Sequence, residues 1–294
     1  MFKWFPQDRQ KLRPIIIIGA PRSGTNMLRD VLTSLPAVAT WPCDEINYIW
    51  RYGNVRHPSD EFTPDMARPA VCDYIRRQFE WVASTYQAPI VVEKTCANSL
   101  RVEFVHRVMP EAQYIFIRRN GLDAVSSAMK RWKAELDIPY LARKARFVPA
   151  RDLCYYASRF VWNRIHLLRS GEERLAFWGP KLQNMEELLR RYSLEEVCAI
   201  QWKRCVDRAK AGFAMLPANR VVEVGYEDFV SSPAAGLQRI LEFLGYPVEN
   251  MAIQKAVAKV SSSSIGKGPS SLGKERIAHV LELIYETQQG LGYV

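Results

Sequence analysis

The sequence predicts an α/β fold in which helices cover both faces of a central parallel sheet. Four short apolar runs, at residues 15–19, 90–92, 114–117 and 221–224, have the length and β-branched content of buried strands. A helical pattern follows each run within a few residues, as in the βα units of a parallel sheet. The chain has 294 residues, 48% of them hydrophobic, and no visible repeat, so we expect one domain over residues 1–294.

The first apolar run leads into the glycine-bounded loop GAPRSGTN, residues 19–26. We expect the backbone N–H groups from Ser23 onward to converge on an anion at the N-terminus of the following helix. In a loop of the form GxxxxGK[ST], the lysine reaches the outer phosphates of a nucleotide and the next hydroxyl holds Mg²⁺. Here Thr25 and Asn26 take those two places, and the cation is Arg22, inside the loop. This arrangement suits transfer of a group that needs no metal, such as sulfuryl.

An acidic pair, Asp44 and Glu45, follows the first predicted helix. Partial burial under the neighbouring tryptophans would raise the pKa of a carboxyl group here toward the range useful for a general base. Acidic residues also favour the first turn of a helix, so the pair could instead begin a helix at Ile46. Residues 53–68, rich in proline and charge, predict an exposed loop before a helix over residues 71–84.

The third apolar run turns into a helix that carries Arg119 and Ser127, eight residues apart. An arginine at the end of a strand offers a planar fork of donors to a phosphate. A serine two turns into the following helix can point back toward the same mouth of the sheet. Arg118 and Ser126 have the same spacing one residue earlier, and we expect their side chains to face elsewhere.

These two motifs, in this order, resemble those of sulfotransferases. The loop is similar to their 5′-phosphosulfate loop, most of all in the tyrosylprotein, carbohydrate and bacterial branches, and Arg119 and Ser127 match their 3′-phosphate motif. The resemblance implies a P-loop-like three-layer fold. It also implies 3′-phosphoadenosine 5′-phosphosulfate (PAPS) as the sulfuryl donor, adenosine 3′,5′-bisphosphate (PAP) as the product, and no required metal.

Two later elements extend the resemblance. Tyr226, after the fourth apolar run, matches the family element YEx[LF], whose tyrosine can lie near the adenine. The segment 261–274 is rich in Ser, Gly and Lys, and Lys267 matches part of a mobile family segment that closes over the 3′-phosphate. The alternatives are a tyrosine that packs the strand end to the core and a flexible linker. The donor-binding residues that the resemblance implies are Arg22, Ser23, Gly24, Thr25, Asn26, Arg119, Ser127, Tyr226 and Lys267.

The resemblance implies a reaction centre as well. Lys94 matches the family's K[TD] element, whose lysine approaches the sulfuryl group; with Arg22 it would neutralise charge on the bridging oxygen. Cytosolic members place a general-base histidine two residues after this lysine, where the chain has Cys96, a poor substitute. The protein-tyrosine branch instead uses a glutamate after the first helix. Glu45 is therefore the expected general base, and Asp44 is the alternative candidate. Arg22 and Lys94 are the other expected catalytic residues.

Residues 140–217 lie outside most of the resemblance and predict an all-helical insertion. Amphipathic runs cover residues 153–168 and 185–216. These helices either pack on the sheet for stability or form a wall that binds the acceptor.

The charge balance favours a polyanionic ligand. Forty-one basic against 31 acidic residues give a net charge of +10, which suits a bisphosphate nucleotide, an acidic glycan or an anionic membrane surface. No nucleic-acid-binding motif appears, so nucleic acid is not an expected partner. The six cysteines form no CxxC pair, no secretory segment precedes them, and no run reaches the roughly 20 apolar residues that cross a bilayer. We therefore expect a cytoplasmic protein, with contact to the inner face of a membrane left open.

The predicted function is transfer of sulfuryl from PAPS to a hydroxyl of a carbohydrate, glycolipid, phenol or tyrosine. One alternative is a kinase-like nucleotide-dependent transferase, against which Thr25 and Asn26 argue and which a Mg²⁺ requirement would support. The other is a non-catalytic binder of acidic glycans or membrane surfaces. The sequence indicates neither the acceptor nor the oligomeric state.

Overall fold

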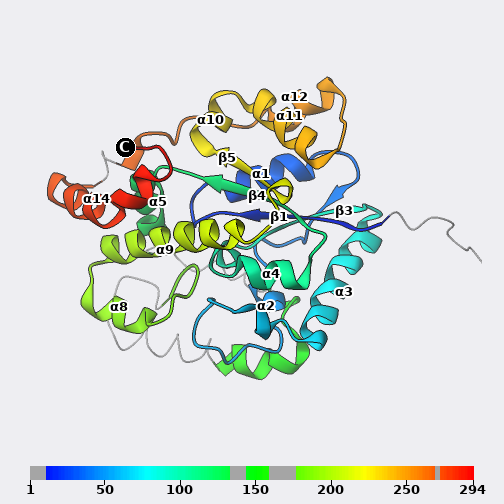
Figure 1. Ribbon diagram of the computed structural model, residues 1–294, viewed down its shortest axis with the longest axis horizontal. Coiled ribbons are helices and arrows are strands. Elements are labelled where there is room, and N and C mark those ends of the chain that lie inside the picture. The colour runs from blue at the N-terminus through cyan, green and yellow to red at the C-terminus, as the bar shows by residue number, and fades with distance from the viewer. Residues whose placement is uncertain (1–10, 133–143, 159–176, 269–271) are drawn as a thin grey trace, which may run out of the picture.

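A sheet of five parallel strands lies between two layers of helices in the computed structural model, which describes residues 11–132, 144–158, 177–268 and 272–294 (Figure 1). The order of strands across the sheet is β2-β3-β1-β4-β5. The expected three-layer α/β fold is thus confirmed, and each of the four predicted strands is present. The strands are β1 (Arg13–Ile18), β2 (Val38–Ala39), β3 (Ile90–Lys94), β4 (Gln113–Arg118) and β5 (Val221–Gly225).

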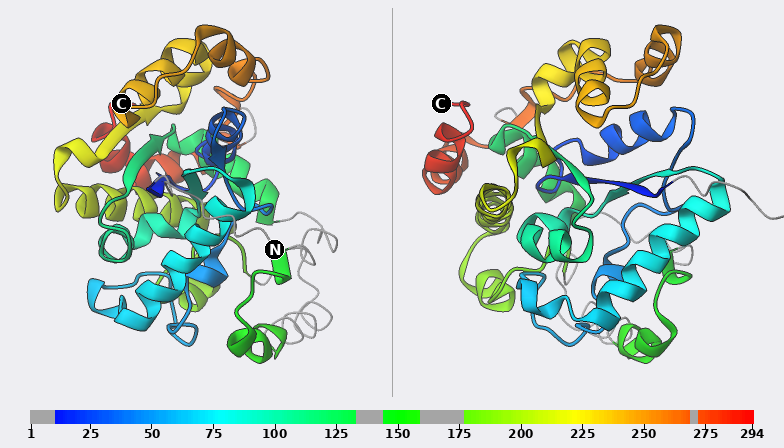
Figure 2. Two further views of the ribbon diagram at one scale, coloured as in Figure 1. Left: turned by 90° about the vertical axis from the view of Figure 1, so that its right-hand side faces the viewer. Right: turned by 45° about the vertical axis from the view of Figure 1, so that its right-hand side comes forward.

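Helices cover both faces of the sheet because its central strand is apolar on both sides. Ile16 and Ile18 of β1 belong to one hydrophobic core, and Ile15 and Ile17 belong to the other. Figure 2 shows the two helical layers from the side. One layer consists of α1 (Thr25–Thr33), α10 (Tyr226–Ser231), α11 (Pro233–Leu244) and α12 (Asn250–Val257). The opposite layer includes α3 (Pro69–Tyr86), α4 (Val102–Val108), α5 (Gly121–Trp132), α9 (Leu194–Ala214) and α14 (Lys274–Gln289).

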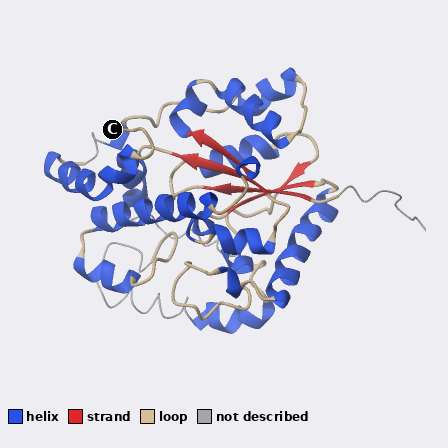
Figure 3. Cartoon of the chain, viewed as in Figure 1, coloured by secondary structure: helices blue, strands red, loops and turns tan. Residues whose placement is uncertain are grey.

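The strand register brings the functional segments together. Ile17 of β1 is level with Lys94 of β3, and Arg118 of β4 is level with Gly225 of β5. Because all strands run in one direction, as Figure 3 shows, their carboxyl ends meet at one edge. The glycine-bounded loop, Lys94, Arg119 and Tyr226 all follow or end these strands at that edge.

The segment between β2 and α3 differs from the expectation. Residues 53–68 contain no α-helix or strand, as predicted, but the loop is exposed only in part. Asn54, Ser59, Asp60 and Phe62 are buried, and a 3₁₀ turn forms at Pro64–Met66. The short helix α2 (Asn47–Trp50) precedes this segment and buries Ile49 and Trp50 in the core. Polar contacts described below explain why the polar residues Asn54, Ser59 and Asp60 are held inside.

The predicted helical run over residues 185–216 is divided into α8 (Met185–Arg191) and α9. The division falls at Ser193, whose side chain accepts from the N–H of Glu196 while the Glu196 carboxylate accepts from the N–H of Ser193. This capping box begins a new helix. Helix α9 packs against α5 and α14 as part of a layer on the sheet. The run over residues 153–168 is helical at residues 153–158, and the rest lies outside the described residues.

Candidate active site

The glycine-bounded loop forms a tight cradle between β1 and α1. Arg22 and Gly24 both adopt left-handed backbone conformations, with φ of 69° and 89°. The N–H of Ser23 donates to the carbonyl of Ala20 at 3.2 Å, which closes the turn. A Cβ atom on Gly24 would overlap the ring of Tyr226, so both the conformation and the close approach require glycine here. The Ser23 hydroxyl is buried and has no hydrogen-bond partner among the described residues.

Arg22 and Ser127 contact each other across the loop. The Nε of Arg22 donates to the Oγ of Ser127 at 2.9 Å, so the second motif joins the first. Burial of the Arg22 guanidinium and the positive charges of Arg131 and Arg119 lower its pKa. Cations that repel one another in this way favour a bound anion.

Arg119 lies under the loop. Its Nη1 donates to the carbonyl of Arg22 at 2.9 Å, its Nη2 donates to the carbonyl of Ser264 at 2.7 Å, and its guanidinium stacks 4.3 Å from the ring centre of Tyr226. Its Nε is buried without a partner in the described part of the chain. Arg118 instead donates to Glu223 at 2.6 Å, which confirms that it faces elsewhere.

The start of the segment 261–274 is docked on this cluster. The N–H groups of Gly266 and Gly268 donate to the two carboxylate oxygens of Asp123 at 2.8 and 2.6 Å. The Tyr226 hydroxyl also hydrogen-bonds the Ser264 hydroxyl. Lys267 is therefore held between two anchored glycines. Sequence reasoning missed Asp123; a signal was available, because it is a charged residue within the apolar stretch of α5.

Lys94 and Glu45 form an ion pair beside the loop. Lys94 Nζ lies 3.0 Å from Glu45 Oε1 and 3.7 Å from Asp44 Oδ1, and the N–H of Cys96 donates to Glu45 at 3.3 Å. Burial opposes ionisation of both partners. The negative charges of Glu45 and Asp44 nevertheless raise the pKa of Lys94, and Lys94 holds the pKa of Glu45 below its usual value. The expectation of a raised Glu45 pKa is therefore wrong, because a buried lysine outweighs the effect of burial.

The Asp44 side chain pairs mainly with Arg29, unlike that of Glu45. Its Oδ1 accepts from Arg29 Nη1 at 2.6 Å. Although burial acts in the opposite direction, Lys94, Arg29 and a hydrogen bond from Asn26 lower the Asp44 pKa. Asp44 thus neutralises two cations, and Asn26 supports it.

Cys96 is a neutral thiol. It is buried with Sγ 3.7 Å from Thr25 Oγ1, and burial together with the charge of Glu45 raises its pKa well above the usual value. This agrees with the expectation that Cys96 does not replace a general-base histidine.

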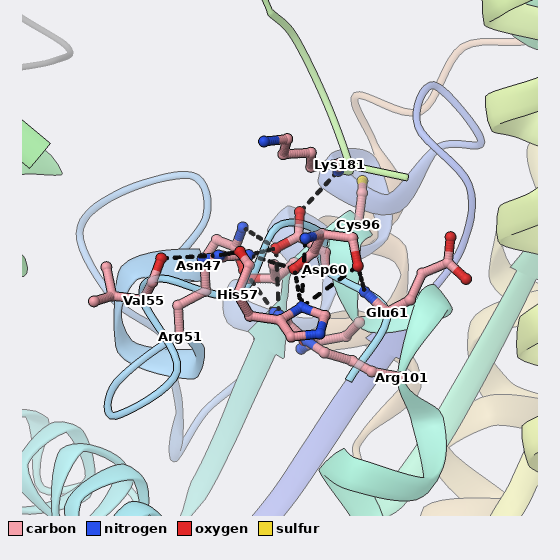
Figure 4. A network of polar contacts seen from close by, with 12 residues as sticks. Asn47, Arg51, Val55, His57, Asp60, Glu61, Cys96, Arg101 and Lys181 are labelled. Atoms are coloured by element: carbon pink, nitrogen blue, oxygen red, sulfur yellow. Dashed lines mark hydrogen bonds and ion pairs between the residues drawn. The ribbon is translucent and has the colours of Figure 1, made fainter. Parts of the chain in front are cut away.

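A buried polar network around Asp60 joins residues 53–68 to Arg51, Arg101 and Lys181, and sequence reasoning missed it (Figure 4). Asp60 is 2% exposed; its Oδ1 accepts from Arg51 Nη1 at 2.7 Å, and its Oδ2 accepts from the N–H of Lys181 at 2.8 Å. Arg101 Nη1 lies 3.5 Å from the same carboxylate. These charges hold Asp60 and its neighbours Ser59 and Phe62 in the interior. In the described ranges, no cluster of three or more His, Cys, Asp or Glu side chains is arranged to hold a metal ion, and no helix is long and apolar enough to cross a membrane.

Comparison with known proteins defines the class. The sulfotransferase family profile matches residues 14–174 and 164–250. The chain belongs to the sulfotransferase family. An uncharacterized protein of Aquifex aeolicus is 24% identical over 204 residues, which cover 65% of this chain and 26% of that protein. The chain thus spans about a quarter of the length of this curated relative.

Solved structures agree in fold. Sulfotransferase STF9 from Mycobacterium avium superposes with a TM-score of 0.53 at 14% identity, covering 96% of this chain and 77% of that one. The sulfotransferase domain of the Synechococcus PCC 7002 olefin synthase gives 0.53 at 13% identity, covering 97% and 98%. Mouse sulfotransferase SULT7A1 complexed with PAP gives 0.51 at 15% identity, covering 94% and 85%.

Proposed function

We propose that this sulfotransferase moves the sulfuryl group from PAPS to a hydroxyl of a carbohydrate, glycolipid or other small acceptor. The observation that carries the proposal is the contact of Lys94 with Glu45 beside the phosphate-type loop. One group is a cation suited to a leaving phosphate, and the other is a carboxylate suited to the proton of an attacking hydroxyl.

The residues around the loop fit such a donor. Ser23 Oγ and Arg119 Nε are buried polar atoms without a partner in the described residues, and a phosphate oxygen would satisfy either. Because Gly24 has no side chain, the ring of Tyr226 packs directly against the loop backbone. We assign the 5′-phosphosulfate to residues 22–26, and the 3′-phosphate to Arg119, Ser127 and Lys267. Tyr226, stacked on Arg119, would then border the nucleoside.

A change of electrostatic partner by Lys94 links the two groups in a direct mechanism. While Lys94 neutralises Glu45, the carboxylate is a weak base because its pKa is low. As the sulfur–oxygen bond to the leaving phosphate breaks, Lys94 and Arg22 stabilise the charge that develops on that oxygen. The attraction of Lys94 to this oxygen weakens its hold on Glu45, so the pKa of Glu45 rises. Glu45 then accepts the proton of the acceptor hydroxyl as the new sulfur–oxygen bond forms.

Calorimetry with PAP and ADP, in the presence of a chelator, tests the donor assignment. PAP should bind without Mg²⁺ and more tightly than ADP. The loop lacks the metal-holding hydroxyl, and Arg119 Nε, which has no partner among the described residues, can donate to a second phosphate. Equal affinity for the two nucleotides would contradict a dedicated 3′-phosphate site. Binding that requires Mg²⁺ would favour a kinase-like transferase.

A further inference from the structure

The two members of the Lys94–Glu45 pair are flanked by residues of one hydrogen-bonded ring. On one side, the N–H of Ile46, directly after Glu45, donates to Thr95 Oγ1 at 3.2 Å. The Thr95 hydroxyl donates to Glu93 Oε1 at 2.5 Å. Glu93 and Thr95 are the residues on either side of Lys94. This half of the ring therefore ties the backbone next to the carboxylate to the backbone next to the cation.

The other half returns through buried side chains. Asn98 Nδ2 donates to Glu93 Oε2 at 3.0 Å, and Arg101 Nε donates to Asn98 Oδ1 at 2.9 Å. Arg101 Nη2 then donates to Asn47 Oδ1 at 2.6 Å. Since Asn47 follows Ile46 in the chain, the ring is closed.

Chemistry determines the direction of the hydrogen bonds that Arg101 and Asn98 make in the ring. Arginine can only donate, so Asn98 and Asn47 must both turn their oxygens toward Arg101. The amide nitrogen of Asn98 then faces Glu93, which must accept. The amide nitrogen of Asn47 faces Asp60 Oδ1 at 3.3 Å.

Four of the five ring side chains are shielded from water, and Asn47 is half-buried. Thr95 and Asn98 are fully buried, and Glu93 and Arg101 are 1% and 2% exposed. Within such an interior a lost hydrogen bond is not replaced by water, so a single cut loosens the whole ring.

We propose that this ring, formed by the side chains of Glu93, Thr95, Asn98, Arg101 and Asn47 with the N–H of Ile46, positions Glu45 against Lys94. The ring residues are positioning residues because none of them contacts the reacting groups through its side chain. The inference rests on the proposed function in taking Glu45 and Lys94 as the reacting pair.

The test compares threonine variants at two sites. Thr95→Val removes the hydroxyl that makes two ring hydrogen bonds, whereas Thr95→Ser keeps it. Thr287→Val is the matched control: Thr287 is also buried, accepts from Lys203 Nζ at 3.1 Å and donates to Asp207 at 2.8 Å, between α9 and α14. Asn47→Ala removes the hydrogen bond from Arg101 Nη2 and so opens the ring at a second point. This variant replaces Thr95→Val if the latter does not fold.

Crystal structures, turnover and PAP affinity are measured for each variant. We expect Thr95→Val and Asn47→Ala to separate Lys94 Nζ from Glu45 Oε1 and to lower kcat about 10- to 100-fold, as a small misplacement of catalytic groups does. PAP affinity should change less than about twofold, because the loop and Arg119 lie outside the ring. Thr95→Ser and Thr287→Val should retain both the ion pair and kcat.

An intact Lys94–Glu45 contact in both ring-cut variants, with kcat equal to that of Thr95→Ser, would overturn the proposal. Separation of the pair without loss of kcat would support the ring and contradict Glu45 as the base. The structural measurement therefore distinguishes failure of the ring from failure of the proposed function.

Discussion

Lys94 Nζ and Glu45 Oε1 are 3.0 Å apart, and the lysine side chain is only 2% exposed whereas that of Glu45 is 25% exposed. The cation is thus buried at the edge of the sheet, and the carboxylate lies on its more open side. Removing Glu45 would leave the buried charge of Lys94 without its closest partner, which is energetically costly.

Glu45→Gln should lower turnover by roughly 10²–10⁴, the usual contribution of a general base. The amide keeps the size of the side chain but cannot take up the proton. PAP affinity should hardly change, as calorimetry can measure. Asp44→Asn should have a smaller effect because Asp44 pairs with Arg29, and Cys96→Ala should leave kcat within a few-fold. If Glu45→Gln kept near-normal turnover while Asp44→Asn was inactive, the general base would be Asp44 and not Glu45.

Arg119→Ala should weaken PAP binding by about 1.5–3 kcal/mol, as expected for a charge-assisted hydrogen bond, and change ADP binding little. The neighbouring Arg118→Ala is the control, since Arg118 pairs with Glu223 instead. Calorimetry on both variants with both nucleotides provides the comparison. An equal loss for PAP and ADP would place Arg119 away from the 3′-phosphate.

Gly24→Ala should destabilise the protein more than Gly245→Ala. Both glycines have positive φ, 89° and 59°, so each substitution costs roughly 1–2 kcal/mol in backbone strain. Only at Gly24 does the added Cβ overlap a neighbour, the ring of Tyr226. Thermal unfolding should show a larger fall in Tm for Gly24→Ala, with loss of PAP binding in that variant alone. Equal shifts and retained binding would mean that the loop adapts.

The free energy of unfolding should depend on pH because of the buried Glu93 carboxyl group. Burial and the charge of Glu45 raise its pKa from 4.5 to about 7, although Thr95 and Lys94 act in the opposite direction. A raised pKa means that the folded state binds the proton more tightly. The stability due to this group is therefore present below pH 4.5 and is lost as the pH rises through 7.

Glu93→Gln removes this titration. Relative to the wild type, its free energy of unfolding should rise by about 3 kcal/mol between pH 4.5 and 7 and remain constant above pH 7. Urea unfolding across this range measures the difference. A difference independent of pH would show that the Glu93 pKa is ordinary.

Local patterns were sufficient to predict the fold and the loop. Strands such as β1 are buried on both faces and therefore consist of continuous apolar residues, which the sequence displays directly. The two-residue strand β2 was missed because it is too short to show any pattern. Helix α9 was joined to α8 because the capping box at Ser193 interrupts an otherwise continuous amphipathic run.

The candidate site was predictable only in part. Arg22, Lys94 and Arg119 end strands or enter helices at one edge, so their convergence follows from the parallel sheet. The pKa of Glu45 depends on its distance from Lys94, 49 residues away in the chain, which no local pattern contains. Arg101 and Asp60 were missed for the same reason. Charged residues are usually predicted to lie on the surface, and only the tertiary contacts reveal that these two residues neutralise each other in the interior.

The most direct test of the central claim is transfer of labelled sulfate from PAPS by the purified protein, with a chelator present. The acceptor panel contains glycans, glycolipids in vesicles, phenols and tyrosine peptides, and Glu45→Gln provides the matched control. We predict transfer to at least one hydroxyl acceptor that persists without Mg²⁺ and is lost in the variant. Absence of transfer to every acceptor, with no change in melting temperature on adding PAP, would contradict the assignment of PAPS as the donor.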